Sequence, residues 1–134
     1  MKSATIKLGF LAALLSVFLI SCSELCETDD VATTALQYRV TVAKPIIAGI
    51  SYRAATGEVV TEDGVLQSLE LWYAHEDVEA PFSALKQVVF VNNHAEEVTY
   101  SLGIYLNGKL IKTKNGSVLP QQQETAMIEY AVAN

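Results

Sequence analysis

The sequence predicts an all-β domain in which two antiparallel sheets pack face to face. Three observations lead to this prediction. Apolar and polar residues alternate with a period of two from Leu36 onward, which is the pattern of strands with one buried face. Turn-forming residues recur at intervals of about ten residues, as in sandwich proteins. After the N-terminal apolar run, no segment shows the 3.6-residue period that marks an amphipathic helix.

The first half of the domain contains strands separated by proline- and glycine-containing turns. Pro45 ends the first strand, because proline cannot donate a ladder hydrogen bond. Thr56 and Gly57 mark the turn after the second strand. Residues 86–92 form a near-continuous β-branched run, which is typical of a strand covered on both faces. The strands expected here are 36–42, 46–53, 59–60, 66–73 and 86–92, with a charged connection over 75–81.

A hairpin over residues 98–112 is predicted from Asn107-Gly108, because a type I′ turn needs positive φ at both central positions. Fixing the turn fixes the register of the two strands. The expected pairs are Leu106 with Lys109, Tyr105 with Leu110 and Ile104 with Ile111. The residues expected to share the core face are then Tyr100, Leu102, Ile104 and Ile111.

The C-terminal part contains further turn signals and one more strand. Asn115-Gly116 predicts a second turn, Pro120 and residues 121–123 predict a polar loop, and residues 124–132 predict the last strand. About seven short strands without a helix describe a single antiparallel β-sandwich of Ig-like size over residues 35–134. A small closed barrel is the alternative architecture.

The N-terminal segment combines basic residues, an apolar run and a cysteine. Lys2 and Lys7 flank the start of the apolar run 8–20, and Ser21 stands directly before Cys22. The L-I-S-C tetrapeptide resembles a bacterial lipobox, where a signal peptidase cuts between Ser21 and Cys22 once Cys22 carries a diacylglyceryl group. We therefore expect a signal peptide over 1–21 and a lipidated tether over 22–34. The alternative is a transmembrane anchor over 1–20, although its apolar run is shorter than the roughly 17–20 residues that span a bilayer.

Charge and cysteine content limit the partners of the mature chain. Removal of residues 1–21 takes two lysines away and leaves 7 basic against 15 acidic residues, a formal net charge of −8. Such a surface repels nucleic acid and anionic headgroups, so no nucleic-acid partner is expected and the lipid on Cys22 is expected to provide the membrane attachment. Cys26 has no partner within the mature chain, and it is either an idle thiol or a bridge to another chain.

The residues after the cysteine bear on localisation. Ser23 follows Cys22, which resembles the rule for sorting lipoproteins to the outer membrane. The acidic residues from Glu24 to Asp30 loosely resemble a signal for export to the cell surface. We therefore expect a lipid-anchored protein of the bacterial cell envelope, located at the outer membrane, that faces either the periplasm or the cell surface.

Three segments of the domain carry a family resemblance. They are I-S-Y-R-A-A-T-G over 50–57, L-W at Leu71-Trp72, and V-T-Y-S-L-G-I-Y-L-N-G-K-L-I over 98–111. In this order they resemble the extracytoplasmic domain of the MmpS family. The resemblance implies an Ig-like β-sandwich that acts as a membrane-anchored, non-enzymatic accessory. Leu71 replaces the family's proline, and Leu102 and Ile128 lie near positions where the family often has a cysteine pair, so no disulfide is expected.

Few residues could carry chemistry. His75, Glu76, Asp77 and Glu79 form the one cluster that could ligate a divalent cation, and a metal-dependent hydrolase using this loop is the alternative to a solvated connection. Trp72 is expected in the core of a sandwich. If Leu71 and Tyr73 occupy the core face instead, Trp72 points outward, and Trp72 and Tyr73 are the candidate ligand contacts.

The motifs of common enzymes are missing from the sequence. It contains no nucleophile elbow, zinc-protease helix, P-loop, dinucleotide fingerprint or heme-attachment motif. No catalytic residue, metal or cofactor is therefore expected. The sequence predicts a non-catalytic binding or accessory module, with an unidentified envelope protein or saccharide as partner and a transport or surface complex as its setting.

Overall fold

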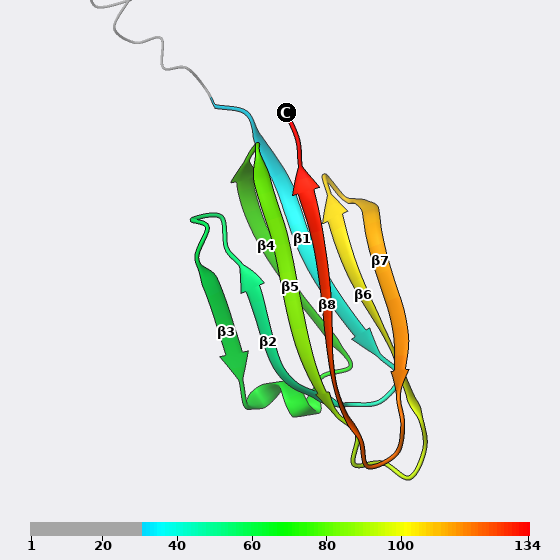
Figure 1. Ribbon diagram of the computed structural model, residues 1–134. Coiled ribbons are helices and arrows are strands. Elements are labelled where there is room, and N and C mark those ends of the chain that lie inside the picture. Colours follow the sequence, from blue (N-terminus) through cyan, green and yellow to red (C-terminus); the bar gives the residue numbers. More distant parts are fainter. Residues whose placement is uncertain (1–30) are drawn as a thin grey trace, which may run out of the picture. The chain divides into compact units, whose positions relative to one another are not determined.

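The computed structural model describes residues 31–134, apart from the side chain of Val65 (Figure 1). Ala32–Asn134 forms one compact unit. Within this range eight strands form two antiparallel four-stranded sheets, so the predicted β-sandwich is confirmed, with one strand more than expected. The predicted signal peptide, the lipidation site Cys22, Cys26 and the tether up to residue 30 lie outside the described residues.

Each sheet mixes strands from the whole domain. Sheet A has the order β4-β1-β6-β7, and sheet B has the order β3-β2-β5-β8. The elements are β1 (Thr33–Val42), β2 (Ile47–Arg53), β3 (Val59–Asp63), the 3₁₀ turn η1 (Val65–Ser68), β4 (Leu71–Glu79), β5 (Phe82–Val91), β6 (Val98–Leu106), β7 (Lys109–Val118) and β8 (Gln123–Val132). No helix within residues 31–134 is long and apolar enough to cross a bilayer.

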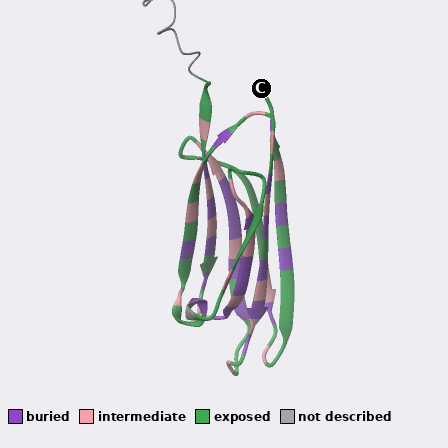
Figure 2. Ribbon diagram, turned by 90° about the vertical axis from the view of Figure 1, so that its left-hand side faces the viewer, coloured by how far each residue is buried: buried purple, intermediate pink, exposed green. Residues whose placement is uncertain are grey.

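The core lies between the sheets and follows the period of two. Figure 2 shows buried and exposed residues alternating along the strands. Aromatic rings link the layers, since Tyr52 lies 5.5 Å from Tyr38 and 5.4 Å from Trp72, centroid to centroid. The Tyr38 hydroxyl donates to the Arg53 carbonyl at 2.9 Å and accepts from the Leu85 amide at 3.2 Å. Tyr38 therefore ties sheet A to two strands of sheet B.

The segment around β4 differs from its prediction. The strand expected over 66–73 is instead the turn η1 followed by β4, and the connection expected over 75–81 is mostly strand. The charged residues in this segment indicated a loop in the sequence. In the structure His75, Asp77 and Glu79 occupy the exposed positions of a strand, and Val78 is fully buried. A strand at a sheet edge tolerates such residues on its wet face.

The β6–β7 hairpin confirms the predicted turn and part of the predicted register. Asn107 and Gly108 have φ values of 49° and 80°, and Leu106 and Tyr105 pair with Lys109 and Leu110. Beyond that point a β-bulge shifts the register, so that Ile104 pairs with Lys112. Ile111 is therefore 36% exposed, and its predicted core position is wrong. A bulge adds one residue to one strand, which the turn residues alone do not indicate.

Two further strand predictions are also corrected. Asn115-Gly116 is not a turn but part of β7, where a Cβ on Gly116 would collide with the Tyr100 phenol. The glycine thus serves close packing across the strand pair. β5 was expected to be covered on both faces, yet Gln87 is exposed and Val89 is half-buried, because only one face of sheet B meets sheet A.

We expect Gly108→Val to destabilise the domain by roughly 1–3 kcal/mol, because a β-branched residue is strained at positive φ. A loss of 1 kcal/mol lowers the melting temperature by about 4–8 °C in a domain of 60–100 residues. Thermal unfolding followed by circular dichroism measures the change. Lys109→Val, on the exposed neighbour, is the control and should melt close to the parent. Equal melting of Gly108→Val and the parent would contradict the turn.

Candidate binding surface

The two predicted ligand-contact residues lie on opposite faces of β4. Trp72 is 6% exposed, and its indole nitrogen donates to Glu62 Oε2 at 2.9 Å. Tyr73 is 56% exposed and lies on the outer face of sheet A, where Leu71 is also exposed. Trp72 therefore belongs to the core and links the edge strands β4 and β3, while Tyr73 is available to a ligand.

Tyr73 is part of a larger group on the outer face of sheet A. Arg39 of β1 is the cross-strand neighbour of Tyr73, and Gln37 of β1 lies between His75 of β4 and Tyr105 of β6. These residues share one face because they pair directly and side chains alternate along each strand. We call this group, Tyr73, His75, Gln37, Arg39 and Tyr105, the outer platform.

Direct contacts hold the outer platform together. Arg39 Nη1 donates to the Tyr105 hydroxyl at 3.3 Å, and Arg39 Cζ lies 4.5 Å from the centroid of that ring. Arg39 Nη2 donates to Gln37 Oε1 at 3.3 Å, and Gln37 Nε2 lies 3.4 Å from His75 Nε2. The His75 and Tyr73 rings are 5.6 Å apart, edge to face. The contacts form a continuous chain across three strands, which fixes the orientations of the exposed groups.

Gly103 makes this arrangement possible. It is the cross-strand neighbour of Arg39 on β6. A Cβ built on Gly103 would lie 2.9 Å from Tyr105 Cε2 and 3.5 Å from Leu110 Cδ1. The first separation is shorter than real Cβ contacts, so the ring of Tyr105 would have to move. The glycine thus allows the tyrosine to lie across the sheet, within reach of Arg39.

The charge of Arg39 is not compensated by a carboxylate. The single ion pair within residues 31–134 joins Lys44 and Glu96, at 3.1 Å, and the Nε of Arg39 is buried without a hydrogen-bond partner. A guanidinium has five N–H donors, and the platform uses two of them. Because Nε is buried, the two remaining Nη–H groups are the donors left for a ligand.

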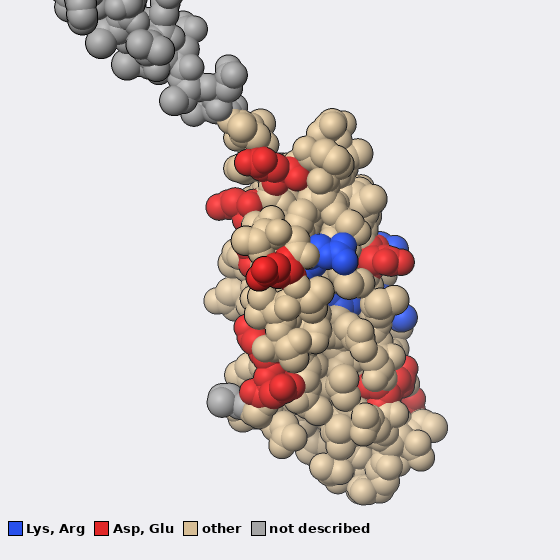
Figure 3. Space-filling view, turned by 60° about the vertical axis from the view of Figure 1, so that its left-hand side comes forward, with Lys and Arg blue, Asp and Glu red and all other residues tan. Residues whose placement is uncertain are grey.

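Most acidic side chains lie elsewhere, on the strands β3 and β4 and directly beside them. Figure 3 shows most of the visible acidic groups along the left of that view, with others at its right. Seven of the eleven acidic residues in the described part of the chain fall between positions 58 and 79: Glu58, Glu62, Asp63, Glu70, Glu76, Asp77 and Glu79. The chain is thus strongly acidic at this edge, and Arg39 stands out as a cation at the centre of sheet A.

Lys86 lies directly beneath the outer platform. It extends from β5 into the core, where it is fully buried, and its Nζ donates to the carbonyl oxygens of Arg39 and Gly103. Burial lowers the pKa of Lys86 to about 7, because removal from water disfavours the charged form. The amine therefore joins the two sheets beneath the residues that present the platform.

The residues of the alternative metal-binding cluster do not come together. His75 and Asp77 lie on the outer face of β4, whereas Glu76 faces the other way and accepts a hydrogen bond from the Ala55 amide at 3.1 Å. Among residues 31–134 no group of three or more His, Cys, Asp or Glu side chains could hold a metal ion. Alternation along a strand separates residues that would be neighbours in a loop.

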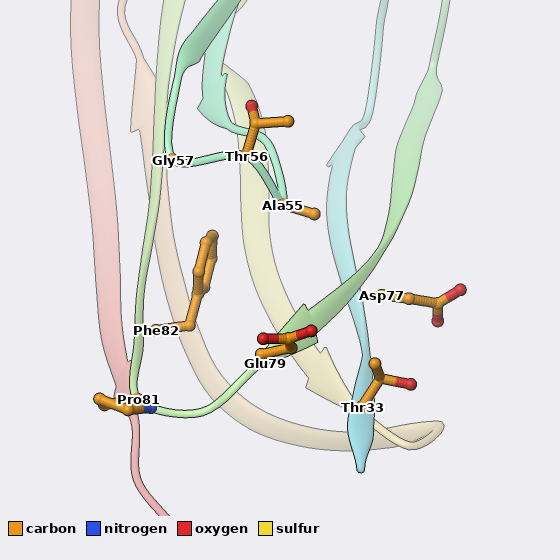
Figure 4. A pocket seen from close by; sticks show the side chains of 8 residues that line it. All are labelled: Thr33, Ala55, Thr56, Gly57, Asp77, Glu79, Pro81 and Phe82. Carbon is orange, nitrogen blue, oxygen red and sulfur yellow. The ribbon is translucent and has the colours of Figure 1, made fainter. Parts of the chain in front are cut away.

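A shallow pocket lies near Glu79 at the end of the sandwich where β1 begins (Figure 4). The Phe82 ring extends toward the Ala55–Gly57 turn, while the carboxylate of Asp77 points away from it. The lining combines one aromatic ring, backbone groups and carboxylates, and it lacks a histidine or a cation. The pocket thus does not unite the residues of the predicted cluster.

No family model matches the chain. No curated protein matches it either.

Sequence reasoning missed Gln37, Arg39, Tyr105 and Lys86. Gln37 and Arg39 were visible as the polar face of the first strand, and the Asn-Gly turn already fixed Tyr105 opposite Leu110. A glycine inside a strand, such as Gly103, signals close packing. Lys86 carried the clearest overlooked signal, since the period of two places it on the same strand face as Val88 and Phe90.

We expect domain stability to rise between pH 7 and about pH 10, by up to roughly 5 kcal/mol. In this window the unfolded chain keeps a proton on Lys86 that the folded chain has released, so rising pH favours folding. Above pH 10 stability should fall again, because burial raises the pKa of Tyr38 to about 12. The unfolded chain then loses the tyrosine proton at a lower pH than the folded chain. Urea denaturation at several pH values measures the profile.

Lys86→Met is the control for this prediction, because methionine is an unbranched side chain without a titrating group. Its stability should be nearly flat between pH 7 and 10, while the decline above pH 10 remains. Identical profiles for the parent and the variant would show that Lys86 does not titrate in this range.

Proposed function

We propose that this protein is a lipid-anchored module of the bacterial cell envelope that binds another envelope component without catalysis. Cys22 carries the lipid, and the β-sandwich, with an Ig-like arrangement, presents the outer platform to the partner. A protein partner is favoured over a saccharide, because tyrosine and arginine are the residues enriched at the energetic centres of protein interfaces. A transport or surface complex is the proposed setting.

The single observation that carries the binding role is the uncompensated, preoriented Arg39 between the exposed Tyr73 and the half-buried Tyr105. Its guanidinium is held by Tyr105 and Gln37, so little side-chain entropy remains to be lost on binding. Tyr73 and Leu71 add exposed apolar surface beside it. A stacked arginine flanked by a tyrosine has the composition of an interface hot spot.

The hydrolase alternative is weaker on geometric grounds. Hydrolysis at His75–Glu79 would require several ligands or a base to converge on one point. The alternation of β4 sends Glu76 to the face opposite His75 and Asp77, and His75 is instead engaged with Gln37 and Tyr73. His75 is therefore a member of the outer platform and does not point toward Glu76.

The anchoring half of the proposal is tested by Cys22→Ala in cells labelled with palmitate. Both lipid attachment and cleavage require the Cys22 sulfur, so the variant should remain an unprocessed precursor and lose the label entirely. Electrophoresis with autoradiography reads both properties. The control is Cys26→Ser, which should be processed and labelled like the parent. Undiminished labelling of Cys22→Ala would overturn the lipobox assignment.

The binding half is tested by photocrosslinking in intact cells, with p-benzoylphenylalanine in place of Tyr73. Irradiation should give one discrete crosslinked product, identified by mass spectrometry. The same amino acid in place of the exposed Gln87, on the outer face of sheet B, is the control and should not give that product.

Arg39→Ala should sharply reduce the yield at position 73, since loss of a hot-spot arginine costs about 2 kcal/mol, or roughly thirtyfold in affinity. Equal yields from positions 73 and 87, or no effect of Arg39→Ala, would contradict the platform as the binding surface.

A further inference from the structure

A second exposed feature lies at the tip of the β6–β7 hairpin. Leu110 and Ile111 are 47% and 36% exposed, and the flanking Lys109 and Lys112 are exposed as well. We call these four residues the hairpin corner. Two exposed aliphatic side chains between two lysines combine apolar surface with positive charge, which is the combination that binds at the interface of an anionic bilayer.

Hydrogen bonds connect the hairpin turn, next to the hairpin corner, with the start of β1, the described strand nearest in sequence to Cys22. The Asn107 amide donates to the Ala35 carbonyl at 2.8 Å, and the Ala35 amide donates to Asn107 Oδ1 at 3.1 Å. Ala35 is the third residue of β1, which begins at Thr33. Ten residues lie between Cys22 and Thr33, and the eleven steps from one Cα to the next span at most about 40 Å. A lipid on Cys22 would thus keep the hairpin corner close to the bilayer.

Charge distinguishes the two sides of this end of the domain. Asp77 and Glu79 lie on β4, at one edge of sheet A, and the hairpin corner lies at the opposite edge on β7. Glu79 pairs with Thr33 and Asp77 with Ala35, so the acidic residues are at the same end as the hairpin. An anionic surface repels the β4 side and attracts the β7 side, even though the chain as a whole is acidic.

We propose that the hairpin corner rests on the anionic headgroup region of the membrane to which Cys22 is anchored. Leu110 and Ile111 enter the interface and Lys109 lies at the headgroups. Lys112 keeps its hydrogen bond to the Glu129 carbonyl and adds positive charge nearby, and the acidic β4 edge is tilted away. The inference rests on the lipid anchor of the proposed function. Two side chains alone bind weakly, and the tether makes the contact effective by holding the surfaces together.

Tryptophan scanning in the lipidated full-length protein tests this contact. Leu110→Trp is compared with Leu119→Trp, because Leu119 is 58% exposed and follows β7 at the far end of the hairpin (Figure 1). Both proteins are reconstituted in phosphatidylglycerol-containing vesicles with and without brominated acyl chains. Trp72 also fluoresces in both variants, and the emission of the parent protein gives the contribution of Trp72 to be subtracted.

We expect about twofold lower emission from position 110 in brominated vesicles, since interfacial side chains lie about 5–10 Å into the headgroup and acyl boundary. Position 119 should not be quenched. The difference should shrink in vesicles of phosphatidylcholine alone or with Lys109→Glu, because both remove the electrostatic attraction.

Flotation of the same vesicles separates the two proposals. If the protein floats with the vesicles but positions 110 and 119 are quenched equally, or not at all, the hairpin contact is wrong while the anchor stands. If the protein carries no lipid and does not float, the anchor fails and the inference fails with it.

Discussion

The register of β1 between β4 and β6 is the constraint on which the other features depend. β1 pairs with both neighbours along most of its length, and the Asn107 turn is hydrogen-bonded to Ala35 at its start. Because side chains alternate, a shift of one residue would move Arg39 into the core and Tyr38 to the surface. The same register therefore decides the core, the outer platform and the position of the hairpin corner.

Edge strands impose a second constraint, because unpaired backbone groups invite association with other chains. The β8 edge is covered from the neighbouring sheet, where Lys112 and Lys114 of β7 donate to the Glu129 and Met127 carbonyls at 2.8 and 3.3 Å. The β3 edge is short, and β4 carries charged side chains on its exposed face. These features limit strand pairing at three of the four sheet edges.

The sequence predicted the two-sheet architecture because alternation and Asn-Gly chemistry are local signals. It failed where a local signal had two explanations. The charges of His75 to Glu79 indicated a loop, yet Val78 is buried and the segment is an edge strand. Asn115-Gly116 indicated a turn, yet Gly116 makes room for Tyr100. The outer platform was missed because its members come from three strands, and only the pairing register brings Tyr73, Arg39 and Tyr105 together.

Lys86 connects the stability of the core with the rigidity of the surface. A buried amine without a carboxylate partner lowers stability at neutral pH, because its charged form is removed from water. The amine of Lys86, however, donates hydrogen bonds to the carbonyls of Arg39 and Gly103. Arg39 supplies the guanidinium of the outer platform, and Gly103 leaves room for the ring of Tyr105. The amine thus holds the inner side of the segment whose outer side presents the guanidinium. A domain that gives up core stability at this point gains a fixed backbone under the proposed binding surface, which is the exchange expected where function sets the local structure.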